Sequence, residues 1–245
     1  PMRFVLIALD GLRPDMVAPE ATPNLINLAA EGTRFANARS VFPSETRVAT
    51  PSLITGCRPG GHGMVANTLF DASAAPDRLL RTKLIEDVAT LARGGESPLG
   101  RPSLGERLAA AGLSFALVSS GTAGAARLLH PAAERLGLFR WNVEDDTGPT
   151  AAAMRDRFGP TPPHAVPNLP RLRHTARILL EHVLPELRPD VTLVWLSEPD
   201  VSFHWGGLLA PHARDALREA DAVIGQVMAW RDAQPDAAQI VIGVL

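Results

Sequence analysis

The chain has 245 residues, 46% of them hydrophobic, which is enough for one large domain with a buried core. Its 24 basic and 26 acidic residues leave a formal net charge of -2 and are scattered rather than grouped in runs. A nucleic-acid polymer is therefore not an expected partner. Cys57 is the only cysteine, so an internal disulfide and a multi-cysteine zinc site are excluded. Any bound metal needs Asp and His ligands.

The N-terminal nine residues contain an apolar run that is too short to span a membrane. No signal-peptide cleavage pattern precedes the acidic Asp10. We therefore expect a cytoplasmic protein that makes no contact with a membrane.

Apolar runs and helical patterns alternate along the chain. Residues 3–9 predict a buried strand, and residues 22–32 predict a helix with an N-cap, a proline in its first turn and a glycine stop. A second helix is expected from the cap at Ser103 to Gly112, and a second buried strand at 114–119. The segments 71–101 and 145–167 are rich in Pro, Gly, Asp and Ala, which is typical of excursions over a sheet.

The C-terminal part repeats the order of helix and strand twice. Apolar residues at helical spacing predict one amphipathic helix at 172–187 and another at 213–227. Continuous apolar runs predict strands at 191–196 and 239–245. We therefore expect an α/β fold, a mainly parallel central sheet with helices on both faces, built as a single domain over residues 1–245.

Two acidic residues follow predicted strands, where doubly wound sheets place their ligand sites. Asp10 ends the first strand, and Asp200 closely follows the strand at 191–196. His204 lies four residues after Asp200, a spacing that on a helix puts a carboxylate and an imidazole on the same side, in reach of a zinc-sized ion. Taken singly, each Asp is more often a turn former or a helix cap.

A loop at 42–46 runs into a predicted helix that ends at Gly56. A hydroxyl at a helix N-terminus lies where backbone N–H groups and the helix dipole favour an anion, which suits attack on phosphate. The alternative is that Thr46 or Ser44 only caps the helix.

Five segments, in the same order and over nearly the whole chain, resemble bacterial type I phosphodiesterase/nucleotide pyrophosphatase proteins of the alkaline phosphatase superfamily. They are VLIALDGLRPD from Val5, TPNLINLAAEG from Thr22, VFPSETRVATPSLITG from Val41, GGHGMVANTLFD from Gly60 and WLSEPDVSFHWGG from Trp195.

The resemblance implies a two-zinc phosphoryl-transfer site. Asp10 and Thr46 would bind one zinc ion, and Asp200 and His204 the other. Thr46 would be the nucleophile, and Asn67 would hold a non-bridging phosphoryl oxygen. The implied reaction is hydrolysis of a small phosphodiester or pyrophosphate through a phospho-threonine intermediate.

Two departures from the family pattern affect this expectation. Family members continue past the strand at 239–245 into a Ser-Asp-His-Gly turn and later supply a further histidine. We therefore expect this chain to lack the C-terminal part of the family's domain and to offer two protein ligands per metal, which would impair zinc binding and turnover.

The second departure is Arg47, which occupies a position where the family usually has an aromatic residue. This favours phosphoester hydrolysis over nucleotide specificity.

Other functions fit the same residues. The chain could be a non-catalytic relative that binds phosphorylated ligands, or a phosphomonoesterase or phosphonate hydrolase on the same fold, because such enzymes differ mainly in their contacts to the leaving group.

Overall fold

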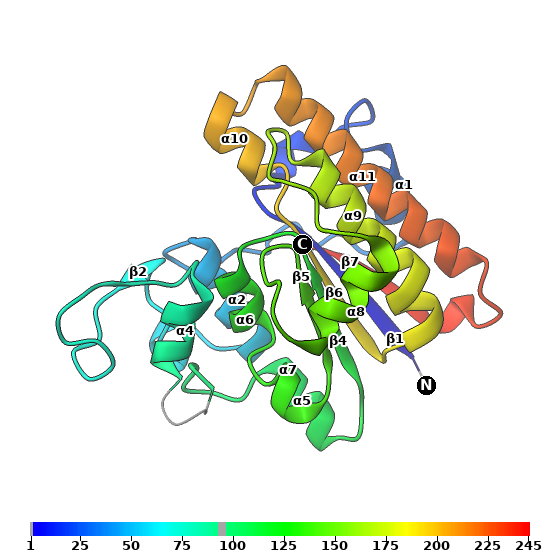
Figure 1. Ribbon diagram of the computed structural model, residues 1–245. Helices are drawn as coiled ribbons and strands as arrows, with labels where there is room; N and C mark the ends of the chain where they lie inside the picture. The colour runs from blue at the N-terminus through cyan, green and yellow to red at the C-terminus, as the bar shows by residue number, and fades with distance from the viewer. Residues whose placement is uncertain (1, 93–96) are drawn as a thin grey trace. The chain divides into compact units, whose positions relative to one another are not determined.

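The computed structural model describes residues 2–92 and 97–245. Five strands form one sheet in the order β5-β4-β6-β1-β7, and a small antiparallel pair joins β2 to β3. Figure 1 shows these strands and the helices that alternate with them along the chain. The predicted α/β fold with a mainly parallel sheet is confirmed.

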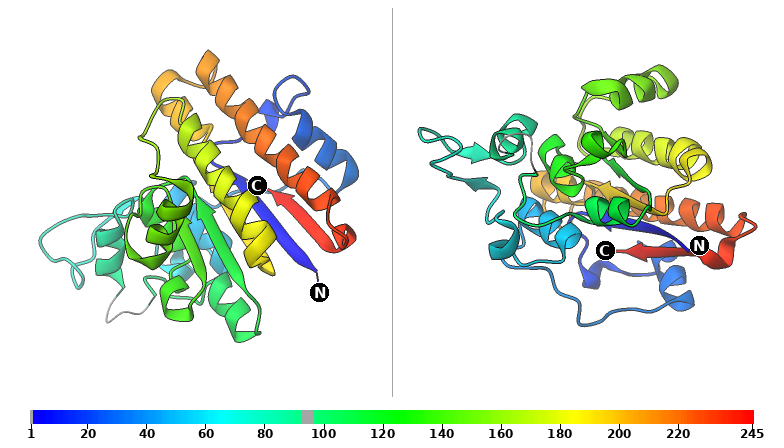
Figure 2. Two further views of the ribbon diagram at one scale, coloured as in Figure 1. Left: turned by 45° about the vertical axis from the view of Figure 1, so that its right-hand side comes forward. Right: turned by 90° about the horizontal axis from the view of Figure 1, so that it is seen from below.

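The four predicted strands all form. They are β1 (Arg3–Leu9), β4 (Phe115–Ser119), β6 (Val191–Leu196) and β7 (Ile240–Val244). β1 pairs in parallel with β6 on one side and with β7 on the other, and Figure 2 shows β7 lying alongside β1. Every residue of β4 and β6 is buried, which explains their continuous apolar runs.

The chain divides into two compact units, described separately below. The first unit comprises residues 1–36, 118–120 and 152–245. It holds β1, β6, β7 and the following helical elements: η1 (Pro14–Met16), α1 (Pro23–Glu31), α9 (Leu169–Ile178), the π-helical η3 (Leu179–Leu187), α10 (Asp200–Gly206), α11 (Pro211–Asp232) and η4 (Ala237–Gln239). That residues 1–245 form a single domain stays a prediction.

The second unit comprises residues 37–117 and 121–151. Within it lie α2 (Thr46–Thr55), α3 (Pro59–His62), β2 (Thr68–Leu69), β3 (Leu80–Arg81), α4 (Ile85–Leu91), α5 (Leu104–Ala110), α6 (Ala123–Leu129), α7 (Ala133–Leu136) and β5 (Phe139–Asn142). Helix α8 (Gly148–Phe158) begins in this unit and continues into the first. The expected excursions at 71–101 and 145–167 thus contain a strand and two helices.

The first helix is stabilised differently from the prediction. Thr22 stands at the N-cap, but its hydroxyl bonds to Ala18 instead of capping the helix. Asp221, fully buried on α11, accepts hydrogen bonds from the backbone N–H groups of Asn24 (3.0 Å) and Leu25 (2.8 Å). A carboxylate from another helix therefore satisfies the open N–H groups of α1 and ties α1 to α11.

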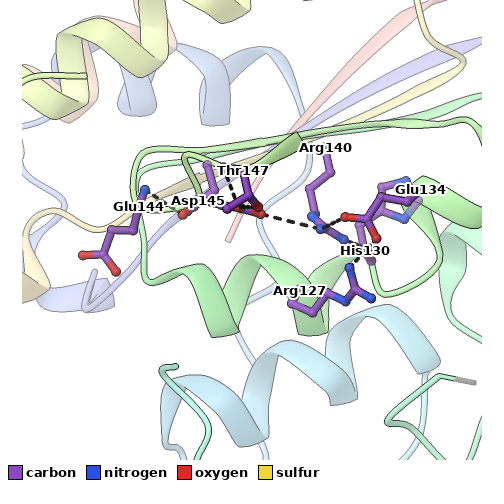
Figure 3. A network of polar contacts seen from close by, with 8 residues as sticks. Arg127, His130, Glu134, Arg140, Glu144, Asp145 and Thr147 are labelled. Atoms are coloured by element: carbon purple, nitrogen blue, oxygen red, sulfur yellow. Dashed lines mark hydrogen bonds and ion pairs between the residues drawn. The ribbon is translucent and has the colours of Figure 1, made fainter. Parts of the chain in front are cut away.

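A buried polar network surrounds β5 in the second unit (Figure 3). The guanidinium of Arg140 is almost fully buried, donates to the carboxylate of Glu134 and donates to the carbonyl of His130 (3.0 Å). The ring of His130 packs against that of Phe115 in a tilted arrangement, with centroids 4.7 Å apart and an interplanar angle of 58°. Neither ring nitrogen has a hydrogen-bond partner among the described residues. Burial, reinforced by the positive charge of Arg140, lowers the pKa of His130 to about 3.

This buried histidine predicts acid sensitivity. The unfolded chain takes up a proton on His130 near pH 6.5, whereas the folded chain stays neutral until about pH 3. The stability that the chain owes to a neutral His130 is therefore fully present above pH 6.5. It is lost progressively as the pH falls from 6.5 towards about 3. Two pH units below the unfolded value, the loss from this residue is about 2–3 kcal/mol.

Urea unfolding at neutral pH and at about pH 4.5 measures this loss. His130→Leu keeps the volume and removes the titrating group, so its stability should fall less over the same pH range. Equal losses in the two proteins would show that His130 does not titrate this way.

No helix within the two described ranges has both the length and the apolar character needed to cross a membrane.

Candidate functional site

Asp10 and Asp200 are joined through their backbones in the first unit. The N–H of Asp10 donates to the carbonyl of Leu196 at the end of β6 (2.9 Å), and the N–H of Asp200 donates to the carbonyl of Asp10 (3.0 Å). Gly11 between them has a φ of 84°, and a Cβ there would lie 3.1 Å from the Cα of Asp200. A glycine is required here because a side chain would push the two acidic residues apart.

Asp200 and His204 lie one turn apart on α10, as their spacing predicts. The Nε2 atom of His204 is 3.5 Å from Oδ2 of Asp200, and the two side chains are 76% and 33% exposed. Two ligands of a tetrahedral zinc ion, each about 2.1 Å from the metal, lie about 3.4 Å apart. The pair thus has the donor types and the separation of two ligands on one zinc ion.

Two buried contacts hold α10 in place. The carboxylate of Glu198 is fully buried and accepts from the N–H groups of Asn168 (2.6 Å) and Ser202 (3.1 Å). His212 lies 3.2 Å from the carbonyl of Ser202, and its ring packs so closely on Gly206 that a Cβ there would come within 2.1 Å. The sequence analysis did not identify Glu198 or His212 as supports for the Asp200 turn.

The metal ligands are incomplete within the described part of the chain. No group of three or more His, Cys, Asp or Glu side chains that could hold a metal ion occurs in residues 2–92 and 97–245. Asp10, Asp200 and His204 have the donor types of divalent-metal ligands, but only Asp200 and His204 also have the separation of two ligands on one ion. They do not form a closed coordination shell.

Thr46 is the first residue of α2 in the second unit, and it is half-buried. The N-cap is Glu45, and its side chain does not cap the helix. Neither Thr46 nor Ser44 occupies the N-cap position, and the alternative that one of their hydroxyls serves as a cap stays a prediction. At this position the Thr46 hydroxyl lies at the helix N-terminus, where open backbone N–H groups can donate hydrogen bonds to a bound anion.

Asn67 is fixed through three of its four polar groups. Its Oδ1 atom accepts from the N–H of Arg47 (3.1 Å), its own N–H donates to the carboxylate of Glu45, and its carbonyl accepts from the N–H (3.0 Å) and hydroxyl (2.7 Å) of Thr82. Within the described residues, only its Nδ2 atom has no hydrogen-bond partner. The bond to Arg47 thus orients the amide so that Nδ2 remains the donor for a ligand.

His62 links α2 to the segment that leads to Asn67. The N–H of Met64 donates to Nδ1 of the fully buried His62 (3.1 Å), so the ring proton lies on Nε2, which is 2.8 Å from the Ser52 hydroxyl. Burial lowers the pKa of His62, which favours this neutral form. No spacing or motif in the sequence indicates this link, although His62 lies five positions before Asn67.

The structure thus assembles two groups of predicted residues, one in each unit. Asp10, Asp200 and His204 come together at the ends of β1 and β6, and Thr46 lies one residue from Arg47, which binds Asn67. Each group is built from residues that are distant in the sequence. Only the Asp200 and His204 pair was predictable from its spacing.

A family model described as type I phosphodiesterase / nucleotide pyrophosphatase matches residues 4–243. Among curated proteins, human bis(5'-adenosyl)-triphosphatase ENPP4 is 33% identical over 72 residues, 29% of this chain and 16% of the relative. An uncharacterized pyrophosphatase/phosphodiesterase of Schizosaccharomyces pombe is 37% identical over 67 residues, 27% of this chain and 14% of the relative.

Two solved structures share the fold. Murine ENPP5, as an inactive threonine-to-alanine variant in complex with AMP, has a TM-score of 0.64 and 15% identity over 100% of this chain and 56% of that chain. Phosphonoacetate hydrolase from Sinorhizobium meliloti 1021, in complex with phosphonoacetate, has a TM-score of 0.64 and 18% identity over 93% of this chain and 53% of that chain. The chain therefore spans about half the length of the solved structures that it matches.

Proposed function

Because the chain belongs to the type I phosphodiesterase/nucleotide pyrophosphatase family, we propose that it hydrolyses phosphodiester or pyrophosphate bonds with Thr46 as the nucleophile. The observation that carries this proposal is the start of α2, where Thr46 is the first helical residue and the N–H of the next residue, Arg47, donates to Oδ1 of Asn67. The variant of ENPP5 that lost a threonine is inactive, which is consistent with this role.

The residues of the first unit suit a metal role. Asp200 and His204 would hold one divalent ion, and Asp10 would be a ligand of a second, with zinc as the metal that these donor types favour. When bound, such ions neutralise phosphoryl oxygens and lower the pKa of a coordinated hydroxyl.

The residues of the second unit perform the transfer. The Thr46 oxygen loses its proton to solvent and attacks phosphorus in line with the leaving oxygen. The bond between phosphorus and the leaving oxygen breaks, so the alcohol or phosphate group departs and a phospho-threonine remains. Water then cleaves the threonine ester and releases the phosphorylated product. The Nδ2 group of Asn67 donates to a non-bridging oxygen in both steps, and the Arg47 bond keeps that group in place.

Activity assays with and without metal test the proposal. Protein loaded with zinc should hydrolyse bis(p-nitrophenyl) phosphate at least about tenfold faster than p-nitrophenyl phosphate, because the diester carries one negative charge fewer and suits a site where the neutral Asn67 amide holds a non-bridging oxygen. A chelator should abolish turnover, and added zinc should restore it. His204→Ala should lower zinc affinity, whereas His164→Ala, which removes an exposed histidine outside the site, should leave it unchanged.

The outcomes separate the alternatives. Binding of a phosphodiester without turnover under zinc, manganese or magnesium would support a non-catalytic ligand-binding relative. Faster cleavage of the monoester or of phosphonoacetate would identify a phosphomonoesterase or a phosphonate hydrolase on this fold.

A further inference from the structure

Glu45 occupies an unexpected place beside the proposed nucleophile. Its side chain stands at the N-cap of α2, yet it does not cap that helix. Its Oε2 atom instead accepts the backbone N–H of Asn67, which lies 22 residues further along the chain. A carboxylate next to an anionic substrate opposes binding through charge repulsion, so its position requires a compensating role.

The bonds of Glu45 and Asn67 form a closed clamp around Thr46. On one side of Thr46, the side chain of Glu45 accepts a hydrogen bond from the backbone N–H of Asn67. On the other side, the backbone N–H of Arg47 donates to the side chain of Asn67. Both sides of the nucleophile are thus tied to the same asparagine. Thr82 fixes the remaining carbonyl of Asn67.

The clamp restricts how Asn67 can move. The bond from Arg47 to Oδ1 alone defines which end of the amide faces the helix, but the loop could still shift along that bond. The charge-assisted bond to Glu45 anchors the main chain of the same residue and removes that freedom. A displacement of about 1 Å at a reacting group can lower a rate by about 100-fold.

We infer that Glu45 is a positioning residue that sets the Asn67 amide against the Thr46 hydroxyl by binding the Asn67 backbone. This inference rests on the proposed function for its kinetic consequence, while its structural consequence is measurable without turnover. The Glu45 carboxylate contacts no reacting atom and acts only through Asn67.

Glu45→Ala and Glu45→Gln provide the kinetic test. Glu45→Ala should lower kcat for bis(p-nitrophenyl) phosphate by about 10- to 100-fold with little change in KM, because a misplaced donor weakens the transition state more than the ground state. Glu45→Gln keeps an oxygen acceptor and should recover kcat to within about fivefold of the starting protein. Glu86→Ala removes an exposed glutamate of α4 in the same unit and should change neither constant.

A double-mutant cycle shows whether Glu45 acts through Asn67. In an Asn67→Ala background, adding Glu45→Ala should cause less than a twofold further loss of kcat, because the group that Glu45 positions is already gone. Independent losses that multiply in the double mutant would overturn the inference.

Amide hydrogen exchange gives a readout that needs no activity. Glu45→Ala should speed exchange of the Asn67 N–H at least tenfold, with a smaller effect for Glu45→Gln and none for Glu86→Ala. Unchanged exchange in Glu45→Ala would overturn the inference even if kcat falls. Absent turnover in the unmodified protein would count against the proposed function, while the exchange rates would still decide the role of Glu45. If Glu45→Ala fails to fold, the exchange rate of the Asn67 N–H in Glu45→Gln decides instead. Faster exchange than in the unmodified protein supports the inference, and unchanged exchange overturns it.

Discussion

Replacing Thr46 with alanine is expected to reduce phosphodiester turnover by at least about 1,000-fold while leaving the fold intact. The side chain is half-buried at the first position of α2, where the N-cap residue is Glu45. The main-chain bond between Arg47 and Asn67 does not use the Thr46 side chain and should persist. The measurement is kcat for bis(p-nitrophenyl) phosphate, with circular dichroism to verify the fold.

Two hydroxyl variants make the prediction specific. Thr46→Ser retains an attacking oxygen and should keep turnover within about tenfold of the starting rate. Ser44→Ala removes an exposed hydroxyl two residues earlier and should have no effect. Near-normal turnover in Thr46→Ala, or loss in Ser44→Ala, would assign the nucleophile to another group.

Replacing Gly124 with alanine is expected to destabilise the second unit by about 3 kcal/mol or more. A Cβ at this position on α6 would lie 2.0 Å from the carbonyl oxygen of Thr82 and 2.8 Å from that of Lys83. Neither carbonyl can move easily, because Lys83 accepts the Gly124 N–H and Thr82 is bonded to Asn67. Urea unfolding followed by circular dichroism measures the change.

The control and the functional consequence of this variant are both testable. The control is Gly60→Ala, because Gly60 is exposed on α3 and a Cβ added there has no atom within 4 Å. The free energy of unfolding of this variant should change by less than about 1 kcal/mol. Since Thr82 is bonded to Asn67, Gly124→Ala should also lower turnover. A stable, fully active Gly124→Ala protein would mean that the 82–83 segment adapts without cost.

The long elements of the fold were predictable because each carries its signal within one segment. β4 and β6 are continuous apolar runs that are buried throughout, and the apolar stripe of α11 has helical spacing. β5 was missed because Arg140 interrupts its short apolar pattern, and the ion pair with Glu134 that permits burial is visible only in three dimensions. α6 was missed because its small residues resemble a loop, although Thr122 does cap it.

The candidate site residues also differ in whether the sequence alone could identify them. Asp200 and His204 were identifiable from a four-residue spacing that α10 preserves. The roles of Glu45 and Glu198 were not, because each depends on a backbone N–H that is distant in the sequence. A carboxylate that binds a remote backbone group leaves no periodic pattern, so only the folded chain reveals it.

The clamp around Thr46 has an evolutionary consequence. Arg47 contributes only its main-chain N–H to the bond with Asn67, and every amino acid except proline carries that group. Position 47 can therefore accept mutations that alter its side chain without releasing the asparagine. Under the proposed function, selection for new substrates could act on this residue, next to the proposed nucleophile, while the bond that holds Asn67 is inherited unchanged.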